Sequence, residues 1–190
     1  AEMISISAVG QYAAAARLSE MWLFIPTTLV MSLFPAIINT RKENKKTYYK
    51  LLQRLYNSVI WMAILISIIV SFSNDWIVTI LYGKEYYESG SVLMIHIWSS
   101  VFIFMGFVFG QYAIIEDLQK KVLYKNVAGM IVNIFLNYVL IGKYGVQGAA
   151  MATLIAQFSA NYLYDFFDKD LKSQRLMKSR SLFPVYLIKN

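Results

Sequence analysis

Long apolar runs without charged residues alternate with short polar segments along this chain of 190 residues. A helix of about 20 apolar residues, rising about 1.5 Å per residue, crosses the ~30 Å hydrocarbon core of a membrane. Helices of this length fit the runs better than strands do. The pattern therefore predicts five membrane-spanning helices, at about 15–39, 56–80, 92–115, 122–142 and 146–164. The apolar stub before Tyr12 predicts the end of a sixth helix, and we expect the beginning of the protein to be missing.

Composition supports a membrane protein rather than a soluble domain. Hydrophobic residues make up 58% of the chain and charged residues 15%, with a mean hydropathy of +0.49. A soluble domain carries about 25% charged residues. Pro26 and Pro35 fall inside the first run, where a membrane helix tolerates them because neighbouring groups satisfy the freed carbonyls. We predict an all-α membrane protein, with a transmembrane bundle over residues 1–164.

Basic residues are distributed unevenly between alternate loops. Fifteen lie after the first, third and fifth spans, and only two lie in the loops after the second and fourth. Loops rich in Lys and Arg stay in the cytoplasm, so this alternation predicts a cytoplasmic C-terminus. The segment 165–190 is then a basic cytoplasmic tail, interpreted as a solvated helix near anionic headgroups or, alternatively, as a helix that docks on a partner.

Polar residues recur at helical spacing inside the fourth and fifth spans. Each set shares one helix face: Asn126, Asn133 and Asn137 in the fourth span, and Thr153, Gln157 and Asn161 in the fifth. Polar groups are costly in hydrocarbon, so such faces turn towards other helices or a water-filled cavity. The two stripes are therefore either interhelical hydrogen-bonding surfaces or walls of a hydrophilic cavity.

Charged residues at the start of the first span allow two interpretations. Arg17 and Glu20 are three residues apart and can form a local ion pair on one helix. Alternatively, Arg17 faces a cavity and contacts an anionic substrate, because a guanidinium matches phosphate oxygens.

The remaining polar positions favour structural roles. We interpret His96, the only histidine, as a packed and hydrogen-bonded side chain rather than a metal ligand. Asp75 is expected to cap the segment 76–82, with cation coupling as the alternative. Gly106 and Gly110 form a GxxxG motif that permits close helix packing. No catalytic or nucleotide-binding motif is present, and the chain has no cysteine, so neither an enzyme nor an ATP-driven pump is predicted.

Three sequence blocks together carry a resemblance to a known family. They are VGQYAAAARLSEMWLFIPTTLVMSLFPAI (9–37), ILYGKEYYESGSVLMI (80–95) and NIFLNYVLIGKYGVQGAAMATLIAQ (133–157). In these blocks the chain resembles the C-terminal half of the O-antigen and polysaccharide flippases, which belong to the multidrug/oligosaccharidyl-lipid/polysaccharide exporter superfamily. The third block is the most specific, and the first favours this subfamily over the multidrug exporters and lipid II flippases.

The resemblance implies a twelve-helix transporter of the bacterial inner membrane, of which this chain supplies the C-terminal six-helix bundle. Its substrate would be an oligosaccharide linked to undecaprenyl diphosphate, turned from the cytoplasmic to the periplasmic leaflet by alternating access, without a cofactor. Its partners would be membrane lipid, the missing N-terminal bundle and polysaccharide polymerase machinery, but not nucleic acid. On this basis the expected cavity residues are Arg17, Glu20, Asn133, Asn137, Gln157 and Asn161.

Two other classes remain open. A cation-coupled multidrug exporter of the same fold needs an acidic residue in its cavity, and the predicted spans hold no carboxylate at mid-membrane. A membrane enzyme of glycan assembly needs large external loops or a set of catalytic residues, and the two external loops predicted here are short.

Overall fold

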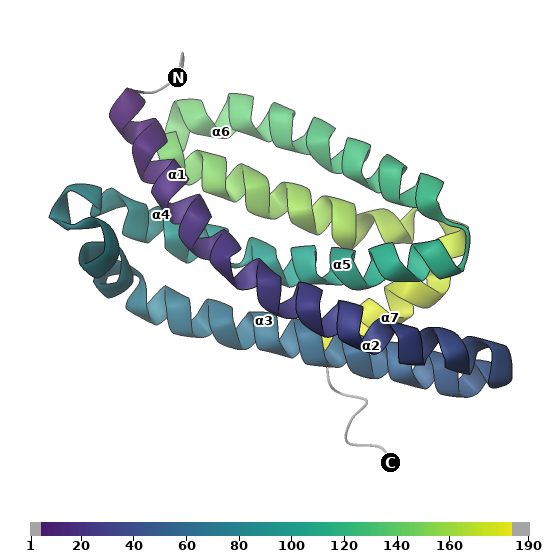
Figure 1. The fold of residues 1–190 in the computed structure, drawn as a ribbon. Helices are drawn as coiled ribbons and strands as arrows, with labels where there is room; N and C mark the ends of the chain where they lie inside the picture. Colours follow the sequence, from purple (N-terminus) through teal and green to yellow (C-terminus); the bar gives the residue numbers. More distant parts are fainter. Residues whose placement is uncertain (1–4, 184–190) are drawn as a thin grey trace.

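The structure, a computed structural model, describes residues 5–183, and these residues form helices joined by short turns, with no strand among them. The all-α prediction is therefore confirmed (Figure 1). The α-helices are α1 (Ile6–Glu20), α2 (Phe24–Glu43), α3 (Lys45–Tyr82), α4 (Glu88–His96), α5 (Ser99–Ile115), α6 (Gln119–Asn161) and α7 (Lys172–Leu182). Short 3-10 helices lie at Met21–Leu23, Lys84–Tyr86, Leu163–Phe166 and Lys169–Leu171.

Four helical stretches in the described residues are long and apolar enough to cross a membrane. They are Ile6–Arg41, Lys45–Tyr82, Glu88–Ile115 and Gln119–Phe166. The last stretch contains a reversal, because Gly145 has φ 55° and ψ −132° in the middle of α6. The two arms of α6 run antiparallel, one on either side of this turn (Figure 1). The four stretches thus contain five rods, in agreement with the five predicted spans.

Glycine makes the α6 hairpin possible at two further positions. A Cβ atom on Gly148 would collide with the carbonyl oxygen of Leu140 in the opposite arm. A Cβ on Gly129 would lie 2.8 Å from Cβ of Ala160, closer than such atoms approach. Small residues therefore bring the two arms into backbone contact, as in other tightly packed membrane helices.

Two local predictions differ from the structure. Tyr12 lies inside α1, which begins at Ile6 with Ser5 as its N-cap, so the stub before Tyr12 belongs to the first rod instead of ending a separate helix. Asp75 does not cap a helix, because α3 continues through it to Tyr82. An unbroken helix keeps every backbone hydrogen bond in a segment that has no water to replace it.

The turns fall into two groups at opposite ends of the bundle (Figure 1). At one end, which we name the basic end, the turns after α2 and after α5 are joined by Arg41, whose Nη2 lies 2.8 Å from Oε2 of Glu116. At the other end the turn after α3 contacts α1, because Gln11 Nε2 donates to the carbonyl oxygen of Glu85 at 2.7 Å. Alternate connections therefore share an end, as the loop charges predicted.

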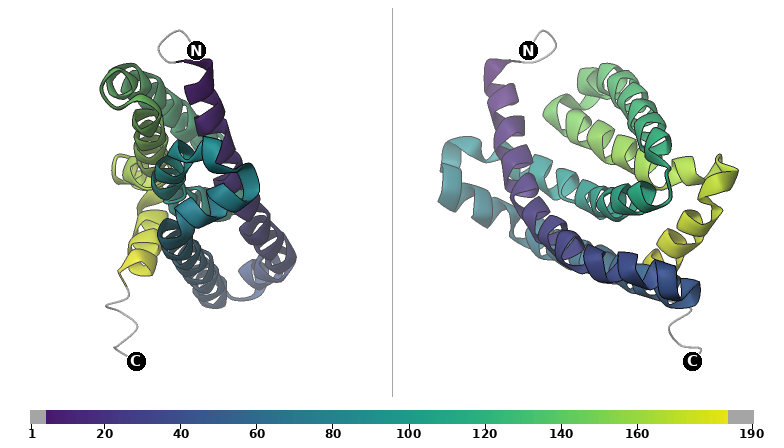
Figure 2. Two further views of the ribbon diagram at one scale, coloured as in Figure 1. Left: turned by 90° about the vertical axis from the view of Figure 1, so that its left-hand side faces the viewer. Right: turned by 45° about the vertical axis from the view of Figure 1, so that its right-hand side comes forward.

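Helix α7 packs back onto α3 at the basic end (Figure 2). Tyr56 donates to Oε1 of Gln174 at 2.7 Å, and both side chains are fully buried. Gln53 donates to Oγ of Ser181 at 2.9 Å. The interpretation of this segment as a solvated helix is wrong for the described residues, because polar side chains of α3 provide partners that fix α7 against its own bundle.

The core gathers around α5. Phe104, Met105 and Val108 are completely buried there and pack against α3. His96, at the end of α4, lies 2.6 Å through Nδ1 from Oγ of Ser19, and it is nearly fully buried. The prediction of a packed, hydrogen-bonded histidine is confirmed.

Candidate functional site

Two adjoining hollows form a polar groove along α6. The larger, of about 380 Å³, lies between the two arms of the hairpin, and the smaller, of about 270 Å³, lies between these arms and α5. Asn126 and Gln157 line both hollows and so connect them. Asn133 and Thr153 contribute to the first hollow, and Lys125 and Asn161 to the second. We call this continuous surface the amide groove.

The amides bond within their own helix arms. Asn137 Nδ2 donates to Oδ1 of Asn133 at 2.9 Å, and Asn161 Nδ2 donates to Oε1 of Gln157 at 2.9 Å. Each pair is four residues apart, so the bonds stay on one helix face. Thr153 alone reaches another helix through its side chain, 3.1 Å from the hydroxyl of Tyr12 in α1. The two polar stripes therefore line a hollow and make few bonds between helices.

This pairing leaves amide donors without partners on residues that line the groove. Among the described residues, Nε2 of Gln157 and Nδ2 of Asn133 have no hydrogen-bond partner within the protein. An amide presents both donors and acceptors, which suits hydroxyl groups of a ligand. Asn137 joins this arrangement through its bond to Asn133 rather than by lining a hollow itself.

Arg17 and Glu20 lie away from the amide groove. Arg17 lines a separate hollow of about 230 Å³ with Tyr82 and Tyr86, near the end opposite the basic end. Both charged side chains are exposed, and within the described residues they form no ion pair with each other. The local ion pair is therefore not formed, and the structure does not bring these two residues together with the four amides.

A buried ion cluster borders the groove at the basic end. Lys125 Nζ lies 2.7 Å from Oδ1 of Asp165, and Lys178 Nζ lies 2.6 Å from Oδ2 of the same carboxylate. All three side chains are at most 2% exposed. The ring of Phe109 lies 3.9 Å from Lys125 Nζ, and the carbonyl of Asn161 accepts from Lys178 at 2.7 Å.

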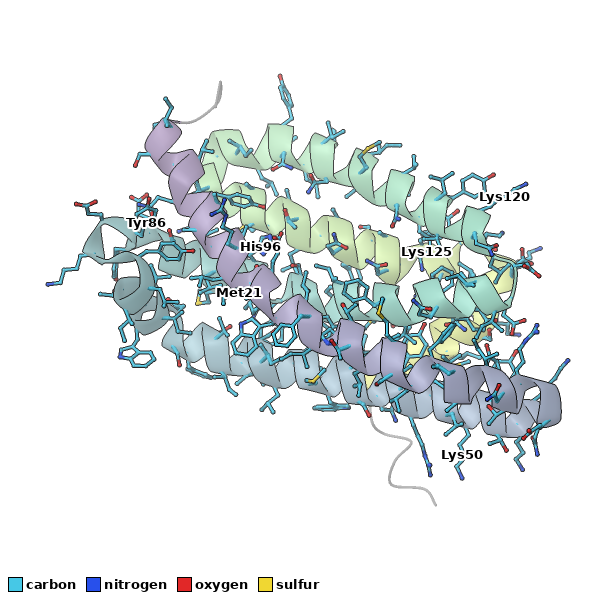
Figure 3. All side chains as sticks on the ribbon, viewed as in Figure 1. Met21, Lys50, Tyr86, His96, Lys120 and Lys125 are labelled. Atoms are coloured by element: carbon cyan, nitrogen blue, oxygen red, sulfur yellow. The ribbon has the colours of Figure 1, made fainter. Side chains whose placement is uncertain are left out.

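Two ammonium groups share one carboxylate, so this cluster carries an excess positive charge. Burial, and next the neighbouring ammonium of Lys125, hold the pKa of Lys178 well below its ordinary value. The aromatic ring and the Asn161 carbonyl partly offset the excess, as cation–π contacts and charge-assisted hydrogen bonds do. Lys125 lies within the bundle, whereas Lys120 extends from the start of α6 (Figure 3).

Lys125 is one of the fifteen basic residues assigned from the sequence to the loops and the tail, in this case to the loop before the fourth span. One feature of the sequence distinguishes Lys125 from the loop lysines: it lies inside the predicted span 122–142. A lysine within a membrane helix needs a partner, so this position indicates a buried ion pair. The identity of the partner was not readable, since Asp165 lies forty residues further along the chain.

The glycines of the GxxxG motif have different surroundings. A Cβ on Gly106 would lie 2.6 Å from Oδ1 of Asn161, whereas nothing lies within 4 Å of one on Gly110. Gly106 therefore lets the Asn161 side chain pack against α5 at the wall of the amide groove. Within the described residues no cluster of three or more His, Cys, Asp or Glu side chains could hold a metal ion.

Comparison with known structures relates this bundle to a transporter. The lipid II flippase MurJ in an inward closed conformation superimposes with a TM-score of 0.67 over 94% of this chain and 41% of the flippase, at 18% sequence identity. The chain has the same fold as the matched part of that protein. This likeness confirms the fold that the resemblance of the three sequence blocks implied.

Part of this chain is also similar in sequence to a protein of polysaccharide biosynthesis. The capsular polysaccharide biosynthesis protein CapF of Staphylococcus aureus is 31% identical over 140 residues, which are 71% of this chain and 34% of that protein. No family model matches the chain. The chain thus spans about a third of the length of this relative and less than half of the solved flippase.

Proposed function

We propose that this bundle is the C-terminal half of a transporter that turns a lipid-linked oligosaccharide across the bacterial inner membrane. Its substrate would be an O-antigen or related polysaccharide repeat unit on undecaprenyl diphosphate. The observation that carries the proposal is the amide groove within a flippase fold. The polysaccharide role of the relative supports a sugar substrate.

The groove suggests how the substrate is held. Unpaired amide donors on Gln157 and Asn133 hydrogen-bond sugar hydroxyls, while the prenyl chain stays in the lipid. No bond of the substrate is made or broken. The two bundles of the transporter then rock against each other to expose the site alternately on either side, as in transporters with repeated halves.

Direction follows from the charges of the loops. The two loops and the tail that hold fifteen of the basic residues in the sequence lie in the cytoplasm in this proposal, and with them the basic end of the bundle. The C-terminus is then cytoplasmic, and the oligosaccharide moves from that leaflet to the periplasmic one. Arg17, near the opposite end, is the proposed contact for the diphosphate. Glu20, three residues further along the chain, belongs to the same proposed site.

Substitutions in the amide groove test the proposal in cells that lack the intact transporter gene. Gln157→Leu and Asn133→Leu in the full-length protein should each slow the appearance of surface polysaccharide about tenfold, the effect of about 1.4 kcal/mol in lost hydrogen bonding. Gln119→Leu is the matched control, because Gln119 is an exposed amide on the same helix outside the groove. Equal rates for all three variants would remove the groove from the mechanism.

Arg17→Ala tests the proposed anionic contact separately. Loss of a guanidinium that binds the diphosphate should reduce surface polysaccharide while leaving the amount of folded protein unchanged, because Arg17 is exposed. Wild-type levels of surface polysaccharide in this variant would exclude Arg17 from substrate binding and leave the role of the amides intact.

A further inference from the structure

A second groove lies on the outer surface of the bundle, between α3 and α7 at the basic end. It encloses about 730 Å³. Tyr49, Leu176 and Met177 form its apolar wall. Lys50, Arg54 and Arg180 form its basic rim. We call it the α3/α7 groove. It is separate from the amide groove, which lies along α6.

The rim of the groove is positively charged and lacks acidic residues among its lining. Lys50 and Arg54 are exposed, and no carboxylate of the described residues lies within salt-bridge distance of either. Lys50 extends outward from the outer side of α3 (Figure 3). The groove therefore suits an anionic group that approaches from outside the bundle.

The position of the rim along α3 places it at a membrane surface. Arg54 is followed by an uncharged segment, 55–74, which ends at Asp75. These residues span about 30 Å of helix, the thickness of the hydrocarbon core. The guanidinium thus lies at the level of lipid headgroups, and Lys50 lies one turn further out.

An apolar track continues from the groove along the same face of α3. Trp61, Leu65, Ile68 and Phe72 follow Arg54 at intervals of seven, four, three and four residues, which keeps them on one side of the helix. Their exposed fractions are 44%, 59%, 40% and 90%. A headgroup held by Arg54 would have its acyl chain directly over this track.

We propose that the α3/α7 groove binds one anionic phospholipid, with its phosphate on Lys50 and Arg54 and an acyl chain along the track from Trp61 to Phe72. The charge of the rim selects an anionic headgroup over a zwitterionic one. The track selects a lipid over a free phosphate, because a soluble anion has no apolar part to place there. This inference does not depend on the transported substrate.

Quenching of tryptophan fluorescence by brominated acyl chains tests this proposal. The full chain is reconstituted into phosphatidylcholine vesicles containing a small fraction of brominated phosphatidylglycerol or, in parallel, brominated phosphatidylcholine. We expect stronger quenching by the anionic lipid, and this preference should disappear in Trp61→Phe, which removes the reporter on the track. Inorganic phosphate in the buffer should leave the quenching unchanged.

Charge substitutions identify the headgroup contact. Lys50→Gln and Arg54→Gln should each weaken the preference about fivefold, which corresponds to the attraction of one basic residue to an anionic headgroup. The matched control is Lys45→Gln with Lys46→Gln, since both lysines are exposed at the same end of α3 but do not line the groove. This control separates binding in the groove from the general attraction of a basic surface.

Three results would overturn the proposal. Equal quenching by the two brominated lipids would show that the groove does not distinguish headgroups. Loss of the preference in the Lys45/Lys46 control to the same extent would assign it to the surface as a whole. Displacement by inorganic phosphate would show that the rim binds a free anion without the lipid.

Discussion

Replacing Asp165 with asparagine removes the only carboxylate of the buried ion cluster. Both carboxylate oxygens accept from a lysine, at 2.7 Å and 2.6 Å, and the Asp165 side chain is completely buried. In Asp165→Asn, Lys125 and Lys178 remain buried without a counter-charge. Breaking a buried pair in this way costs about 3–5 kcal/mol, so the free energy of unfolding should fall by about that amount.

Replacing one of the two lysines should have a smaller effect. Lys178→Met leaves a neutral pair of Lys125 and Asp165 and removes an ammonium whose burial is unfavourable. Its costs are the two hydrogen bonds that Lys178 donates, to Oδ2 of Asp165 and to the carbonyl of Asn161, about 1 kcal/mol each, and the loss of the unfavourably buried ammonium offsets part of them. The cluster therefore predicts a strong asymmetry between removal of its anion and removal of one cation.

Equilibrium unfolding in mixed micelles, followed by circular dichroism, measures both variants. Asp170→Asn serves as the control, because this carboxylate also pairs with a lysine, Lys121, but is 66% exposed and should leave stability near the wild-type value. If Asp165→Asn and Lys178→Met destabilise the protein equally, the charge-balance argument is refuted.

Three further predictions concern single positions. Because the pKa of Lys178 is lowered in the folded protein, the folded state binds fewer protons than the unfolded state below about pH 10.5. The free energy of unfolding should therefore rise as the pH increases towards about 10.5. Lys178→Met should flatten this rise when unfolding is measured between about pH 7 and 9. Gly148→Ala should destabilise the α6 hairpin, because the added Cβ would collide with the Leu140 carbonyl. In the control Gly142→Ala the added Cβ has no atom within 4 Å, so this variant should be neutral or stabilising by up to about 1 kcal/mol. Equal melting temperatures for the two variants would contradict this. Ser19→Ala should cost about 1–2 kcal/mol, because it removes the buried partner of His96, and an unchanged unfolding midpoint would show that this bond contributes nothing.

The distribution of apolar runs and loop charges predicted the main architecture. Hydrophobicity and charge act locally along the chain, so they indicate where a helix can cross lipid and where it must end. Helical periodicity also predicted one polar face with Asn126 and Asn133 and a second with Gln157, and the structure brings these two faces together around one hollow. The turn that divides the last two rods lies at Gly145, between the predicted spans 122–142 and 146–164.

Contacts between distant segments could not be read in this way. The cluster of Lys125, Asp165 and Lys178 joins α6 to the segment that follows it and to α7, and no local pattern specifies this pairing. Docking of α7 depends on buried polar contacts such as the hydrogen bond between Tyr56 and Gln174, and in the sequence Gln174 looks like a residue of a solvated tail. The position of Arg17 away from the amides likewise follows from how α1 packs, since all these residues lie in predicted spans.

Translocation by the intact transporter in proteoliposomes tests directly whether the protein turns a lipid-linked oligosaccharide across the membrane. A fluorescent lipid-linked oligosaccharide is incorporated in both leaflets, and a membrane-impermeant reductant bleaches the outer leaflet. We expect fluorescence to fall below the level left by the inner leaflet without added ATP, and we expect Gln157→Leu, but not Gln119→Leu, to slow this second phase. Fluorescence that stops at the outer-leaflet half with correctly folded wild-type protein would contradict this expectation.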